Sequence, residues 1–198
     1  MTKLALWAAL LAAPFASSAH AGVTVDVTQS GPNVVATASG SIDTSLLTFY
    51  GSPFGSADGS YPSTAFIGLG GSPLDGYSGL SGPTSFGPGG FTFGTSTTGS
   101  GFEINGSTSL LFLPVGYLSG SAVSDTETWA GQTITSLGFT PGTYIYTAAR
   151  TDIVTINVAS PAGVPEPSTW AMILSGFAVV GFALRRNRPA GRTERQLV

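Results

Sequence analysis

Hydrophobic and polar residues alternate with a period of two over several short segments of this chain. Residues 23–28 read Val-Thr-Val-Asp-Val-Thr, and Val154, Ile156 and Val158 occupy alternate positions near residue 155. Because successive side chains of a β-strand point to opposite faces, this alternation predicts strands with one buried face. The predicted strands are residues 23–28, 34–38, 46–50, 65–69, 91–93, 102–104, 110–113, 129–137, 143–147 and 152–158.

Turn-forming residues separate these segments. Gly, Ser and Pro recur most densely over residues 51–90, which we expect to form loops apart from the short strand at 65–69. Residues 22–159 show no sustained 3.6-residue period, so no amphipathic helix is expected there. Many short strands with frequent turn signals predict an all-β fold, an antiparallel β-sandwich over residues 22–159.

The first 21 residues have the pattern of a secretory signal peptide. Lys3 precedes a short apolar run, and Ala19 and Ala21 give the small-x-small pattern that signal peptidase requires. We expect signal peptidase to cut after Ala21 and leave Gly22 as the new N-terminus.

A second apolar segment lies near the C-terminus. Residues 170–184 contain no charge, and with Thr169 before them the run predicts a single transmembrane helix at 169–184. Trp170 suits one membrane interface, and the arginines after residue 184 suit the cytoplasmic side. We expect residues 160–164 to be a linker and residues 189–198 a cytoplasmic tail.

The order of motifs around this apolar run resembles the PEP-CTERM protein-sorting signal. A Pro-Glu-Pro tripeptide, the apolar run and an arginine cluster follow one another over residues 165–188. The resemblance implies recognition by an exosortase, a membrane-embedded cysteine transpeptidase-like enzyme that cleaves near Pro-Glu-Pro. The residues that carry it are Pro165, Glu166, Pro167, Trp170, Arg185, Arg186 and Arg188.

Charge and composition exclude several classes of function for the exported part. Residues 22–164 hold eight acidic residues against Arg150 alone, a formal charge of about −7, whereas the whole chain carries −3. Such a domain is repelled by phosphates, so nucleic-acid binding is excluded. The chain has no cysteine, and its one histidine lies in the signal peptide. Ser/His and Cys/His catalysis, zinc sites and disulfides are therefore excluded, and we expect no cofactor.

Carboxylates are the remaining reactive groups. Glu103, Asp125 and Glu127 could form a glycosidase pair, but we expect them to be solvated charges at strand ends and assign no catalytic residue. Asp125 and Glu127 are also a weak candidate pair for Ca²⁺, which prefers oxygen ligands.

Aromatic residues within the glycine-rich segment could instead stack on sugars or pack beneath the loops. These residues are Tyr50, Phe54, Tyr61, Tyr77 and Phe86.

The sequence therefore predicts an exported, non-enzymatic protein. We expect an inner-membrane precursor with a cytoplasmic C-terminus that an exosortase processes for the cell surface or extracellular matrix. A structural or adhesive part in an exopolysaccharide biofilm is the leading interpretation. A carbohydrate-binding module and a permanently anchored single-pass protein are the alternatives.

Overall fold

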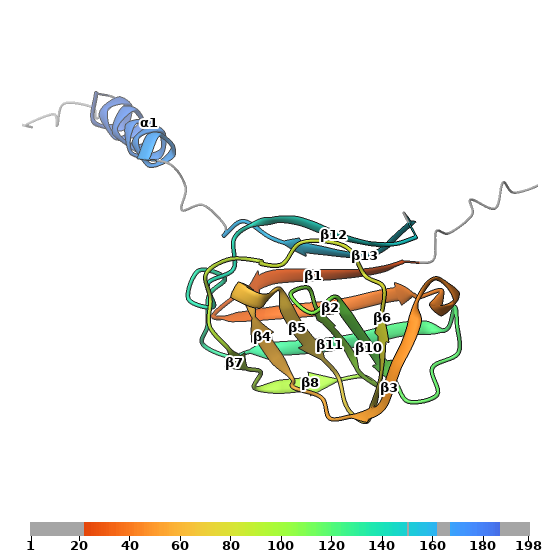
Figure 1. Cartoon of the computed structure of the whole chain (residues 1–198). Coiled ribbons are helices and arrows are strands. Elements are labelled where there is room, and N and C mark those ends of the chain that lie inside the picture. Colours follow the sequence, from red (N-terminus) through yellow and green to blue (C-terminus); the bar gives the residue numbers. More distant parts are fainter. Residues whose placement is uncertain (1–21, 150, 162–166, 187–198) are drawn as a thin grey trace, which may run out of the picture. The chain divides into compact units, whose positions relative to one another are not determined.

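The computed structural model describes residues 22–149, 151–161 and 167–186 (Figure 1). The chain divides into two units, a β domain that ends at Ala159 and a C-terminal unit that begins at Ser160. The signal peptide with Ala19 and Ala21, the motif residues Pro165, Glu166 and Arg188, and the tail at 189–198 lie outside the described residues.

The described β domain contains two sheets, whose strands cross one another in Figure 1. Sheet A has six strands, in spatial order β12 (Gly142–Ala148), β13 (Thr151–Val158), β1 (Val23–Ser30), β2 (Asn33–Ser41), β11 (Ala122–Trp129) and β8 (Ser96–Thr98). Sheet B has seven, in order β3 (Thr48–Phe54), β6 (Leu74–Ser78), β10 (Leu110–Pro114), β9 (Phe102–Asn105), β5 (Phe66–Leu69), β4 (Gly59–Tyr61) and β7 (Thr92–Phe93).

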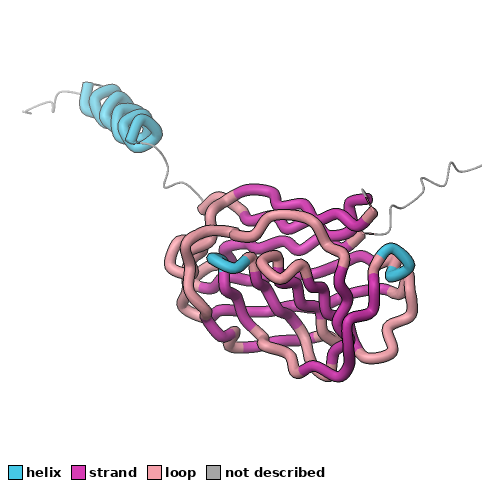
Figure 2. Tube along the Cα trace, in the orientation of Figure 1, coloured by secondary structure: helices cyan, strands magenta, loops and turns pink. Residues whose placement is uncertain are grey.

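Short 3₁₀ turns η1 (Thr44–Leu46) and η2 (Pro62–Thr64) interrupt the strands, and the remainder of the domain is loop and turn (Figure 2). The pairings are antiparallel with one exception. β1 and β13 run parallel, with Val25 opposite Ile156. The all-β prediction is therefore confirmed, while a purely antiparallel arrangement is corrected by this pair.

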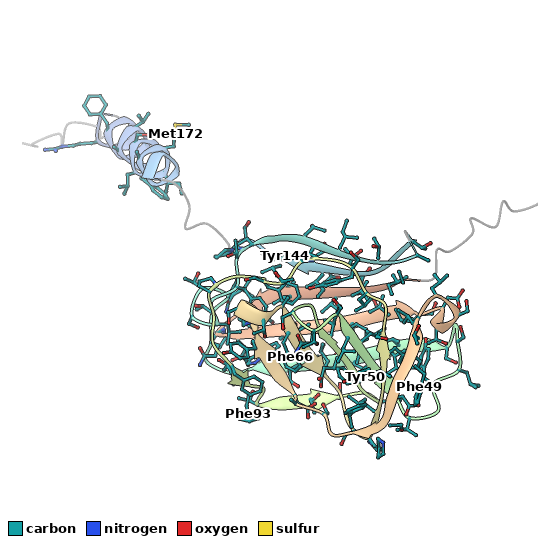
Figure 3. All side chains as sticks on the ribbon, in the orientation of Figure 1. Phe49, Tyr50, Phe66, Phe93, Tyr144 and Met172 are labelled. Atoms are coloured by element: carbon teal, nitrogen blue, oxygen red, sulfur yellow. The ribbon has the colours of Figure 1, made fainter. Side chains whose placement is uncertain are left out.

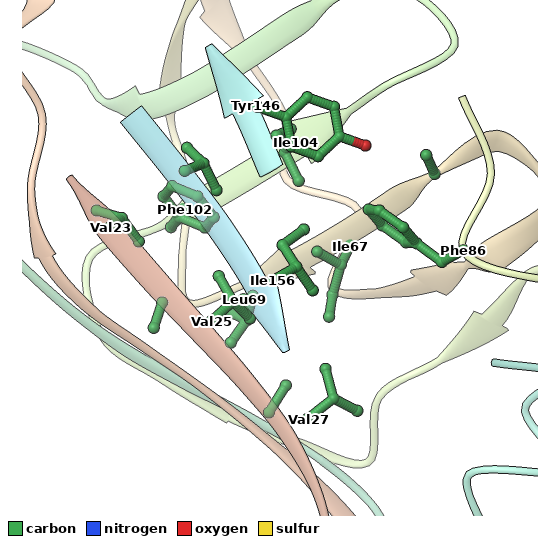
Figure 4. Packing of buried hydrophobic residues seen from close by; sticks show 14 of the residues in the cluster. Val23, Val25, Val27, Ile67, Leu69, Phe86, Phe102, Ile104, Tyr146 and Ile156 are labelled. Carbon is green, nitrogen blue, oxygen red and sulfur yellow. The ribbon is translucent and has the colours of Figure 1, made fainter. Parts of the chain in front are cut away.

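Both sheets contribute side chains to one hydrophobic core, as expected of a sandwich. Val23, Val25 and Val27 alternate along β1 and point into it, because a strand presents every second side chain to the same face (Figure 4). Ile67 and Ile104 approach them from sheet B. Phe86 and Tyr146 close one end of the core, where their ring centroids lie 6.2 Å apart.

Two sequence expectations fail within the β domain. Residues 51–90, expected to be mostly loops, contain β4, β6 and most of β3. The strand expected at 129–137 is absent, because β11 ends at Trp129 and turns follow it. Phe86 is fully buried, which is the packed one of the two arrangements considered for the loop aromatics.

The C-terminal unit contains one described helix, α1 (Pro167–Arg186). It carries exposed apolar side chains such as Phe177 and Met172, which Figure 3 labels. Among the described residues no helix is long and apolar enough to cross a membrane. The prediction of a helix at 169–184 is confirmed, but its assignment as a transmembrane span is not.

Candidate functional site

The alternation of β11 places acidic side chains on the core-facing side of sheet A. Val123, Asp125, Glu127 and Trp129 are all buried, whereas the residues between them are not. Trp129 donates from its indole nitrogen to the Thr92 carbonyl at 3.2 Å, which links β11 to β7 in the other sheet. The expectation that these acids are solvated at strand ends is therefore wrong.

Glu127 is fully buried and only half satisfied. Its Oε1 accepts a hydrogen bond from the Thr128 amide at 3.1 Å, while its Oε2 has no hydrogen-bond partner. Gly94 packs directly against this carboxylate, where an added Cβ would overlap it. Burial raises the pKa of Glu127, the bond from the Thr128 amide opposes the rise, and the nearby Asp58 charge adds to it.

A pocket of about 150 Å³ lies beside Glu127. Its other lining residues are Asp58, just before β4, and the residues that connect β7 to β8 and begin β8. The pocket therefore lies where the chain crosses from sheet B to sheet A. The Gly94 amide donates to the Asp58 carbonyl at 3.2 Å, and the Ser56 hydroxyl donates to the Asp58 carboxylate. These bonds fix the loop that brings Asp58 to the pocket.

Asp125 occupies a separate environment. Its Oδ1 accepts from the Gly101 amide at 2.8 Å, and its Oδ2 has no partner. Gly70 and Gly99 have positive φ and surround the same carboxylate, where a Cβ at either position would collide with it. Burial raises the pKa of Asp125, and backbone amides lower it. Asp125 shares the buried face of β11 with Glu127 but does not line the pocket of Glu127.

Glu103 lies on the outer face of sheet B, the face that does not contact the shared core. It alternates with the core residues Phe102 and Ile104, so it faces away from the shared core. The Ala57 amide covers it and donates to its Oε2 at 3.2 Å. Burial raises the pKa of Glu103 to about 7, with a further contribution from the charge of Asp58. The three acids considered together from the sequence thus occupy three different environments.

The burial of two of these acids could have been predicted from the alternation of residues along β11. Asp125 and Glu127 are in phase with Val123 and Trp129, so an apolar strand pattern continued through both acids would have placed them inward. Asp58 had no such signal, because its role depends on how the loop before β4 folds. Within the described residues no group of three or more His, Cys, Asp or Glu could hold a metal ion.

The proposed aromatic candidates separate into exposed and packed residues. Tyr50 and Tyr61 are exposed, Phe54 and Tyr77 are half-buried, and Phe86 belongs to the core. Tyr50 stacks on Phe54 with centroids 6.1 Å apart. The sequence missed three further exposed aromatics, which are Phe49, Phe91 and Phe93.

The described part of the sorting signal is helical. Pro167, Trp170, Arg185 and Arg186 fall within α1, and Arg185 is exposed. The fold and the site thus define a two-sheet β domain with an open acidic pocket over a buried glutamate, followed along the chain by a short helical C-terminal unit.

Comparison with known families identifies this C-terminal unit. Residues 163–188 match the family model described as the PEP-CTERM protein-sorting motif. The match confirms the resemblance and supports an exported protein that an exosortase processes. No curated protein and no solved structure matches the chain.

Proposed function

We propose that this chain is a non-enzymatic surface or matrix protein with a structural or adhesive part in an extracellular polysaccharide. The observation that carries the proposal is the PEP-CTERM motif at residues 163–188, which implies export and a membrane-anchored precursor. A β domain rich in Gly, Ser and Thr with no cysteine supports an extracellular part that folds without disulfides.

A non-enzymatic role is supported by the lack of most catalytic side-chain types in residues 22–164. Residues 22–164 contain no Cys, His or Lys, which removes the usual nucleophile–base pairs and Schiff-base chemistry. Glu127 faces between the sheets and lines the pocket, whereas Glu103 faces away from the core and does not line it. This favours a binding or structural role over glycoside hydrolysis, which needs two carboxyl groups flanking one bond.

Cell fractionation with an epitope tag after Ser160 tests the sorting part. We expect wild-type protein to lose its C-terminal segment and to appear at the surface or in the medium. Replacing Pro165, Glu166 and Pro167 by Ala should leave full-length protein in the membrane fraction. Pro161→Ala, which lies outside the matched residues, is the control and should be processed normally. Full-length protein in the membrane for every variant would favour a permanently anchored protein instead.

Carbohydrate contact is a second candidate, which the exposed aromatics of sheet B favour. Phe49 and Tyr50 are adjacent on β3 and are 59% and 60% exposed. Rings of this kind provide apolar faces on which sugars can stack, and large exposed apolar groups mark interaction surfaces. Binding to purified cell polysaccharide should fall when both residues become Ala. Leu118→Ala, a 75% exposed apolar residue elsewhere, is the matched control. Equal binding by all variants would remove this candidate.

A further inference from the structure

The first 128 residues of the β domain, 22–149, carry negative charge with no basic side chain among them. Residues 22–149 contain seven acidic residues and no Lys, Arg or His. Asp58 lies close enough to Glu103 and Glu127 for its charge to raise the pKa of both. Like charges in a partly buried region destabilise one another unless a proton or a cation neutralises them. Within residues 22–149 no side chain can supply that positive charge.

The pocket beside Glu127 offers oxygens and nothing softer. Asp58 and Glu127 supply carboxylates, and Thr95, Ser96 and Thr97 supply hydroxyl and carbonyl oxygens. Glu127 is 0% exposed, and its Oε2 lacks any hydrogen-bond partner. A buried carboxylate oxygen without a partner is costly, so a proton, a water or a cation bound at this atom would be stabilising. The volume of about 150 Å³ accommodates an ion with several waters.

We propose that this pocket binds a hard divalent cation, Ca²⁺, between the carboxylates of Asp58 and Glu127. Zinc and the softer metals prefer His and Cys, which the pocket lacks. Ca²⁺ tolerates irregular sets of carboxylate, carbonyl, hydroxyl and water oxygens, whereas Mg²⁺ requires near-octahedral geometry. The site differs from the pair suggested by the sequence, because Asp58 takes the place of Asp125.

The local structure explains why both ligands are held in place. Gly94 gives the Glu127 carboxylate the room that a side chain would fill, and its amide anchors the Asp58 backbone at 3.2 Å. The Thr97 hydroxyl accepts from the Gly70 amide at 2.7 Å, which fixes this wall of the pocket. A bound cation would therefore join β11 and β8 of sheet A to the β4 end of sheet B.

The competing explanation is a proton on Glu127. A neutral Glu127 would relieve the repulsion by Asp58 without any metal. The two explanations differ in their response to added Ca²⁺ alone, so a titration of the full chain separates them.

The experiment is calorimetric titration of the purified full chain with CaCl₂ at pH 7.5, after EDTA treatment and buffer exchange, together with thermal unfolding. We expect saturable binding of one ion and a rise in melting temperature with Ca²⁺ concentration. Asp58→Asn should weaken binding at least about tenfold, and Glu127→Gln should abolish it. Asp26→Asn removes an exposed carboxylate on β1 and should bind as wild type does.

Asp58→Asn keeps the proposal falsifiable if Glu127→Gln fails to fold, because Asp58 is only half-buried and lies on a loop. Circular dichroism verifies the fold of each variant. No saturable binding at millimolar Ca²⁺, or binding unchanged by Asp58→Asn, would overturn the site. Equally tight binding of Mg²⁺ would overturn the assignment to Ca²⁺.

Discussion

Glu103→Gln should stabilise the β domain at neutral and alkaline pH. Burial raises the pKa of Glu103 from 4.5 to about 7, so the folded state holds a proton there that the unfolded state releases. Stability therefore falls as pH rises from about 4.5 to about 7 and stays low above it. At 1.36 kcal/mol per pH unit, the loss is at most about 3 kcal/mol. Gln keeps the shape and an acceptor for the Ala57 amide while carrying no charge.

The assay is urea unfolding of wild type and Glu103→Gln between pH 4 and pH 8.5 in EDTA. The two proteins should match near pH 4, and the variant should be more stable by as much as about 3 kcal/mol at pH 8, which is roughly 10 °C in melting temperature. Asp43→Asn is the contrasting control. Hydrogen bonds from Ser45 lower the pKa of this exposed carboxyl, so its pH effect has the opposite sign and lies at lower pH. A constant difference between Glu103→Gln and wild type at every pH would refute the reasoning.

Three further predictions concern the framework of the domain. Trp129→Phe loses the bond to the Thr92 carbonyl and part of the core, and should cost about 1–3 kcal/mol in urea unfolding. Tyr146→Phe removes the hydroxyl that donates to the Pro83 carbonyl at 2.7 Å and should cost about 1 kcal/mol by the same assay, whereas Tyr50→Phe at the exposed edge should cost nothing measurable. A chain ending after Ser160 should unfold at the same urea concentration as the full chain, and a lower midpoint would contradict the division into two units.

The strands most easily predicted from the sequence have apolar residues on one face and mostly polar residues on the other. Residues 23–28 and 34–38 lie within β1 and β2, and residues 143–147 and 152–158 lie within β12 and β13. In these strands the core-facing residues are apolar, so alternation alone indicates both the strand and its buried face. Alternation does not predict which strands pair with one another, because the parallel contact of β1 with β13 joins residues more than 120 positions apart.

Other strands were missed because their buried positions do not have apolar side chains. Gly51 of β3 pairs with Gly76 of β6, and the ring of Phe54 covers both, so an aromatic side chain from elsewhere fills the space. In β11 the core-facing positions 125 and 127 are acidic. Acidic residues in a sequence normally predict an exposed strand or a loop. The same feature concealed the pocket, since the acids that line or border it look like surface charges.

The parallel pair of β1 and β13 also bears on how the protein can be released. β13 lies between β12 and β1 in sheet A, so the sheet is complete only when the segment just before the sorting motif has taken its place. The Ala159 amide donates to the Val27 carbonyl at 2.9 Å, which is the last such bond along the described part of the β domain. Pro165 follows six residues later, within about 20 Å even for a fully extended chain. Cleavage near Pro-Glu-Pro would therefore cut the chain beyond every hydrogen bond that the described residues contribute to the sheet. Processing by an exosortase is thus compatible with a β domain that is already folded.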